Sequence, residues 1–251
     1  MLALEALVAL CVSLYIVIGI GVGVRLLRIA ARTRRLPEAA LGTTLFCFAA
    51  LSQPAAILQQ VLRDQGEAGY SGAFAIVSWI GTFLALVGLA LFTWQTFRAG
   101  ERWAMALFAA AIAIDALALG RVALQIASGA GDSAQLGPWI ALSCAAYAVI
   151  FGWGAVEGWL AFSAARRRER LGLAEPLLKN RLLLWAVSSS GGLAADVLLI
   201  PLLLSGGDLT QDARAQLAIA SSALLNGVCW YLAFAPPPVY RRWMEGAAAP
   251  A

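Results

Sequence analysis

The sequence has no histidine and few charges. Charged side chains make up 13% of its 251 residues, whereas a soluble domain usually has about 25%. Too few charges are present to cover a water-facing surface, which excludes an ordinary soluble enzyme and a disordered chain. The absence of histidine excludes histidine-ligated haem, most zinc and copper sites, and Ser-His or Cys-His nucleophile pairs. We therefore expect neither a cofactor nor a metal site.

Cysteine is also scarce and lacks metal-site spacing. The four cysteines are Cys11, Cys47, Cys144 and Cys229, and each lies inside an apolar stretch. No C-x-x-C pair occurs, so a zinc ribbon or a thioredoxin-like motif is excluded. The cysteines are expected to be small buried hydrophobic residues.

Long hydrophobic runs dominate what is present. Hydrophobic residues make up 61% of the chain, and a bilayer core about 30 Å thick requires about 20 apolar residues of helix. The alternation typical of a transmembrane β-barrel is missing. The sequence predicts an all-α, polytopic integral membrane protein, a seven-helix bundle forming one transmembrane domain over 1–251. The spans are expected near 3–27, 37–62, 73–97, 103–128, 138–164, 182–204 and 217–235.

Basic residues gather in alternate connections, which predicts an orientation. Fifteen of the 18 basic residues lie between the first and second, third and fourth, and fifth and sixth spans, or after the seventh. Only Arg63, Arg121 and Arg214 lie toward the other side. The positive-inside rule then places the N-terminus outside and the C-terminus in the cytoplasm. We expect a multi-pass protein of a bacterial cytoplasmic (inner) membrane. The same bias explains the basic net charge without nucleic acid as a partner.

Five polar side chains within the predicted spans stand out. Because ionisable groups in hydrocarbon are costly, each is a candidate functional residue. One interpretation is a ligand-binding pocket in the outer half of the bundle, in which Arg121 meets Asp196 and Asp115 lacks a partner. The other is an interhelical lock of hydrogen bonds and ion pairs. The five residues are Asp115, Arg121, Asp196, Asn226 and Gln53. Glu157 lies toward the cytoplasmic side of the fifth span and is expected to pair with a loop arginine.

Two spans contain residues that weaken helices. Glycine and serine loosen a helix, and proline removes a backbone hydrogen bond. Broken helices build midplane sites in transporters, while small residues also allow close helix packing. The predicted break positions are Ser188, Gly191, Gly192, Pro201 and, in the second span, Pro54. Gly19 with Gly23, and Gly154 with Gly158, form G-x-x-x-G pairs suited to helix contacts within the bundle or in a homo-oligomer.

The segment 166–181 is the longest cytoplasmic feature predicted, and it is basic with an apolar centre. It could lie along the inner leaflet and bind anionic lipid, dock a protein partner, or remain a solvated loop. The residues expected to interact are Arg166, Arg167, Arg168, Arg170 and Arg181.

Three function classes remain open. Seven spans with an outside N-terminus is the topology of microbial rhodopsins, but a retinal Schiff base needs a lysine in the last span. The single lysine, Lys179, lies in a connection. A receptor-like sensor that binds a small molecule and signals through a separate partner is preferred. The alternatives are a small-molecule or proton-coupled transporter, and a lipid-active enzyme using Asp/Glu acid–base chemistry.

Overall fold

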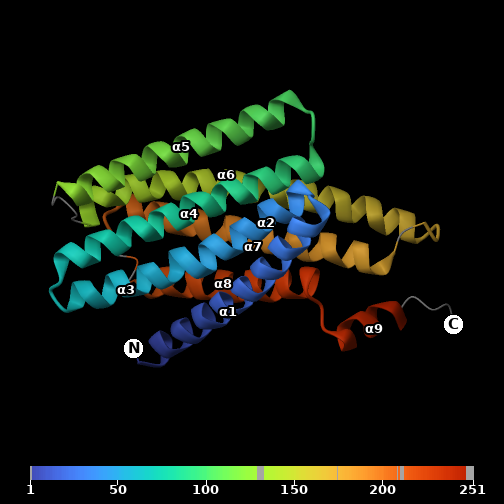
Figure 1. Cartoon of the computed structure of the whole chain (residues 1–251), viewed down its shortest axis with the longest axis horizontal. Helices are drawn as coiled ribbons and strands as arrows, with labels where there is room; N and C mark the ends of the chain where they lie inside the picture. The colour runs from blue at the N-terminus through green and yellow to red at the C-terminus, as the bar shows by residue number, and fades with distance from the viewer. Residues whose placement is uncertain (1, 129–132, 174, 208, 210–211, 247–251) are drawn as a thin grey trace.

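The computed structural model describes residues 2–128, 133–173, 175–207, 209 and 212–246, and every regular element in them is helical (Figure 1). The all-α prediction is therefore confirmed for this part of the chain. The elements are α1 (Leu2–Thr33), α2 (Leu36–Phe46), the π-helical segment η1 (Cys47–Ser52), α3 (Gln53–Asp64), α4 (Ala68–Phe97), α5 (Arg102–Ala127), α6 (Ser133–Glu169), α7 (Pro176–Leu204), α8 (Ala213–Phe234) and α9 (Pro238–Gly246).

Seven of these helical stretches are long and apolar enough to cross a membrane, as predicted. One of them combines α2, η1 and α3 into a single span, Leu36–Asp64. Large apolar side chains point away from the bundle, for example Val17 on α1 (70% exposed) and Leu124 on α5 (65% exposed). Surfaces of this kind suit contact with lipid rather than water, which indicates a multi-pass membrane protein.

The spans form a ring in sequence order. Each span packs on the next, and α1 closes the ring by packing on α8. In addition, α4 contacts α6 directly, so α5 lies outside the ring, on the seam between its two neighbours (Figure 1). Six spans therefore surround the interior of the bundle. The remaining span, α5, covers the contact between α4 and α6 from outside.

The two ends of the bundle differ in charge. The connections α1–α2, α4–α5 and α6–α7 lie at the same end as α9 and carry most of the basic residues (Figure 1). We call this the Arg-rich end. The opposite end, where α1 begins, is the N-terminal end. Which end faces the cytoplasm stays a prediction of the positive-inside rule.

Glycines allow the closest helix contacts. A Cβ added at Gly23 would lie 2.9 Å from the backbone nitrogen of Phe46, and one at Gly19 would lie 2.6 Å from the Cβ of Ala49. Likewise, a Cβ at Gly158 would lie 3.0 Å from the Cα of Ala186. These G-x-x-x-G residues thus serve packing inside the bundle, of α1 on α2 and of α6 on α7.

The two predicted helix breaks have different outcomes. Before Pro54 the span becomes π-helical over Cys47–Ser52, so the helix is disturbed where the proline lacks its amide donor. By contrast, α7 is a continuous α-helix from Pro176 to Leu204. The breaks expected at Ser188, Gly191, Gly192 and Pro201 are wrong, because Pro201 falls in the last turn and the small residues are packed against neighbouring helices.

The basic segment 166–181 is not an extended loop. Arg166, Arg167 and Arg168 form the last turn of α6, and Arg181 belongs to α7. Arginine forms helices well and is favourable near a helix C-terminus, so the helix continues past the apolar region. A short turn joins the two helices, with Gly172 at a φ of +70° and a Lys179 Nζ–Glu169 Oε1 ion pair of 2.6 Å.

Candidate functional site

A cavity of about 400 Å³ lies inside the ring. Its described walls come from α1, α2, η1, α3, α4, α6, α7 and α8, together with Leu209 from the α7–α8 connection. No described residue of α5 lines it, which agrees with the position of α5 outside the ring. Volumes of this order are typical of small-molecule sites.

The cavity walls are mainly apolar and rich in aromatic rings. The aromatic residues that line it are Tyr15, Phe48, Trp79, Tyr147, Phe151 and Trp230. Small residues leave the space between them, including Ala85 on α4, Ala195 on α7 and Ala223 on α8. A few polar groups among apolar walls is the usual composition of a ligand pocket.

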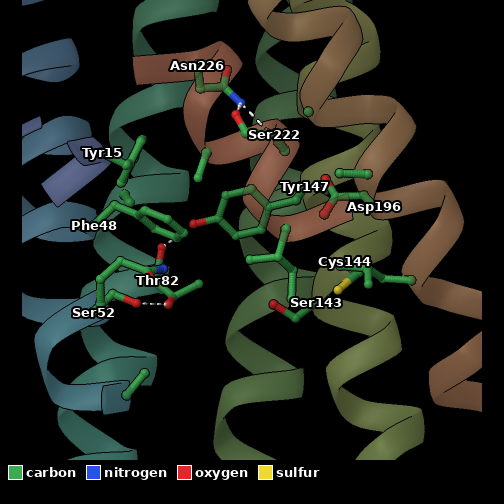
Figure 2. A pocket seen from close by; sticks show the side chains of 18 of the residues that line it. Tyr15, Phe48, Ser52, Thr82, Ser143, Cys144, Tyr147, Asp196, Ser222 and Asn226 are labelled. Carbon is green, nitrogen blue, oxygen red and sulfur yellow. Dashed lines mark hydrogen bonds between the residues drawn. The ribbon is translucent and has the colours of Figure 1, made fainter. Parts of the chain in front are cut away.

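Hydroxyl groups connect three spans across one side of the cavity. Ser52 Oγ of η1 lies 2.7 Å from Thr82 Oγ1 of α4. Tyr147 of α6 reaches across and donates its hydroxyl to the Thr82 carbonyl oxygen at 2.5 Å (Figure 2). The Thr82 hydroxyl also bonds back to the carbonyl of Ser78 at 3.0 Å. This network fixes the position of the Tyr147 ring in the cavity wall.

Asp196 brings a carboxyl group to the wall opposite Ser52 and Thr82. Figure 2 shows it on the same side of the cavity as Cys144 and Tyr147. Its Oδ2 atom is buried and has no hydrogen-bond partner among the described residues. A buried carboxyl oxygen without a partner is costly, which sets Asp196 apart from the other polar residues of the cavity wall.

Asn226 lines the cavity, but its side chain is already engaged. Its amide oxygen accepts a hydrogen bond from Ser188 of α7. Its amide nitrogen donates to the Ser222 carbonyl oxygen at 2.9 Å and to the Ser222 hydroxyl at 3.1 Å (Figure 2). Asn226 thus joins α7 to α8 in the cavity wall. Gln53 also lines the cavity, and its side-chain amide bonds to no other described side chain.

The remaining two predicted residues do not line the cavity. Asp115 of α5 is 2% exposed and accepts a 2.5 Å hydrogen bond from Ser143 of α6. Arg121 is exposed, and its guanidinium lies 4.9 Å from the centre of the Trp139 ring. No ion pair joins Arg121 to Asp196 in the described part of the chain, so that expected pairing is wrong. Sequence alone could not show it, because α5 lies outside the ring.

Several cavity residues were not predicted. Thr82, Ser52 and Tyr147 carry the hydroxyl network, yet such residues are common in apolar spans and carry no charge. A weak signal existed, since Ser78 and Thr82 are four residues apart and so share one face of α4. Only the structure places Ser52 and Tyr147 opposite that face.

A second polar cluster lies toward the Arg-rich end. The Arg98 Nε atom lies 2.6 Å from Glu157 Oε1, and the Trp153 indole nitrogen donates to the same oxygen at 3.4 Å. Glu157 is 7% exposed. The hydrogen bond and charge of Glu157 raise the pKa of the Arg98 guanidinium above its ordinary value. The expected pairing of Glu157 with a loop arginine is confirmed, and it ties the α4–α5 connection to α6.

The predicted basic interaction surface is exposed at the tip of the α6–α7 hairpin. Arg166, Arg167, Arg168, Arg170 and Arg181 are all exposed. Beside them, Leu171 and Leu173 are each 73% exposed. The structure thus presents basic and apolar side chains together, while the partner remains a prediction.

Within the described residues, no three acidic or cysteine side chains gather as a metal-binding group. Comparison with known proteins gives no match to this chain among family models, curated proteins or solved structures.

Proposed function

We propose that this chain is a receptor-like sensor of a bacterial inner membrane, which binds a small molecule in the bundle cavity and signals through a separate protein. The observation that carries the proposal is the aromatic cavity of about 400 Å³ with the unpartnered Asp196 carboxyl in its wall. The N-terminal end faces outside and the Arg-rich end faces the cytoplasm, as the positive-inside rule predicts.

Two helices connect the cavity to the Arg-rich end. The helix α6 contributes Tyr147 to the cavity and ends in the exposed Arg166–Arg168 turn. The helix α7 contributes Asp196 and begins beside the same hairpin. A ligand that changes the packing of α6 on α7 would therefore move the basic hairpin, which is where a cytoplasmic partner or anionic lipid would detect it.

A matched pair of alanines on α7 tests the proposal. Ala195 lines the cavity, whereas the adjacent Ala194 is exposed on the outside of the bundle. Native mass spectrometry of gently extracted protein, with an absorption spectrum, should show a stoichiometric small molecule. Ala195→Leu should fill part of the cavity and abolish that adduct, and Ala194→Leu should retain it.

A thermal-shift screen of small molecules extends the test to a ligand lost on extraction, since binding to the folded state raises the melting temperature. Compounds that stabilise the wild type and Ala194→Leu, but not Ala195→Leu, support the cavity as the binding site. If no compound and no adduct distinguishes the two variants, the cavity is not a ligand site.

The π-helical segment favours a transporter as the second candidate. Phe48 and Ser52 of η1 line the cavity, and π-helical turns within α-helices are frequent at functional sites and allow local rearrangement. Flux of a stabilising compound into liposomes, lost in Asp196→Asn, would establish transport. A sensor predicts binding without flux. The enzyme alternative has less support, because Asp115 does not share the cavity with Asp196.

A further inference from the structure

The cavity contains an acid without a base. Asp196 is the acidic side chain among its described lining residues, and none of those residues is lysine or arginine. A carboxyl group in such a place either holds its proton or pairs with a cation, because an uncompensated charge away from water is strongly unfavourable.

The surroundings of the cavity do not supply that counter-charge. The nearest predicted partner, Arg121, is exposed and stacks on Trp139. Arg98 pairs with Glu157 toward the Arg-rich end. A second buried carboxyl, Asp115, lies behind Ser143 and also has no basic partner among the described residues. The interior of the bundle therefore attracts positive charge.

The aromatic walls favour the same sign of charge. Faces of tryptophan, tyrosine and phenylalanine attract cations, and quaternary ammonium groups are typically bound by several such rings. Tyr15, Phe48, Trp79 and Trp230 line the cavity together with the carboxyl of Asp196. An inorganic cation fits less well, because among the described residues no second carboxylate lines the cavity and no three acidic or cysteine side chains gather.

We propose that the ligand is a lipophilic organic monocation, an amine or quaternary ammonium compound whose cationic group pairs with Asp196 and whose apolar body lies among the aromatic rings. This inference rests on the proposed function, since it assigns a chemical class to the ligand of the same cavity.

Two probes of one shape test the charge. Benzyltrimethylammonium and neopentylbenzene differ only in a cationic nitrogen that replaces a quaternary carbon. Binding to purified protein in lipid nanodiscs would be measured by thermal shift and by tryptophan fluorescence, to which Trp79 and Trp230 contribute. We expect the cation to bind about tenfold or more tightly than the neutral probe.

The variant Asp196→Asn keeps the size of the side chain and removes its charge. The affinities for the two probes should then become similar, mainly because the variant binds benzyltrimethylammonium more weakly. The control is Asp64→Asn, which removes the same charge from the exposed end of α3 and should keep the preference for the cation.

The outcomes separate the two proposals. Equal or tighter binding of neopentylbenzene by the wild type overturns the inference and leaves the cavity as a ligand site. A cation preference that survives Asp196→Asn also overturns it. Binding of neither probe overturns it too, and the alanine pair and compound screen then decide the proposed function independently.

Discussion

At the residue scale, burial and partners separate structural groups from groups free to act. Asn226 and Asp115 are predicted site residues whose polar atoms bond to neighbouring helices, through Ser188 and Ser143 respectively. Asp196 differs because its Oδ2 atom is buried in the cavity region without a described partner. The lock interpretation therefore describes Asn226 and Asp115, whereas the pocket interpretation stays a proposal for Asp196.

Two glycines of α1 provide a test of close packing. Gly23→Ala should lower the free energy of unfolding by about 1–3 kcal/mol, because its new Cβ would meet the backbone of α2. Gly21→Ala is the control, since nothing lies within 4 Å of a Cβ there. It should be neutral or stabilising by up to about 1 kcal/mol. Thermal unfolding in detergent measures both, and equal destabilisation would contradict the α1–α2 contact.

The Arg98–Glu157 pair provides a second test. Arg98→Met should lower the melting temperature, but by less than the loss of a fully buried pair would, because the arginine is 38% exposed. The cost arises because Glu157 stays buried without its partner. The double variant Arg98→Met/Glu157→Leu should recover much of the loss. If the losses of stability in the single variants Arg98→Met and Glu157→Leu simply add in the double variant, the ion pair contributes nothing.

At the element scale, length and apolar composition predicted the spans well, but not how they pack. All seven spans were predicted, because a membrane requires long apolar helices. Sequence could not show that α5 stands outside the ring, since its composition resembles that of the other spans. This is why Asp115 and Arg121 were grouped with cavity residues. The residues at 188–192 were ambiguous for a similar reason, because serine and glycine both loosen helices and permit close packing.

The π-helical segment predicts an uneven stability along one span. Backbone hydrogen bonds are weaker in π-turns, and Pro54 supplies no amide donor. Amides of 47–52 should exchange with solvent faster than those of 41–46, although both segments contain buried residues. Hydrogen exchange with mass spectrometry measures this, and Pro54→Ala should slow exchange in η1. Equal protection in the wild type would show that η1 is no weak point.

At the whole-molecule scale, positive charge is concentrated at one end of the bundle. Most basic residues lie at the Arg-rich end, and the arginines of the α6–α7 hairpin are exposed on its surface. The positive-inside rule predicts orientation from this asymmetry. The asymmetry could be predicted from the sequence, because it depends on the composition of the connections rather than on helix packing.

Cysteine labelling in intact cells tests the orientation. A cysteine that replaces the exposed Gln65 lies at the N-terminal end, and one that replaces the exposed Leu171 lies in the Arg-rich hairpin. A membrane-impermeant maleimide should label the first and not the second. The four native cysteines lie within helices and three are buried, so background labelling should be low. The reverse pattern would invert the orientation.

The ring closes where α1 meets α8, the first and last of its spans. A ribosome makes α1 long before α8, so this joint forms only after all the other spans have been synthesised. Until then, the interior that holds Asp196 is open on one side to lipid. The cavity is therefore completed late in biogenesis, because a nascent chain that stops before residue 213 would lack the α8 wall that carries Ala223, Asn226 and Trp230.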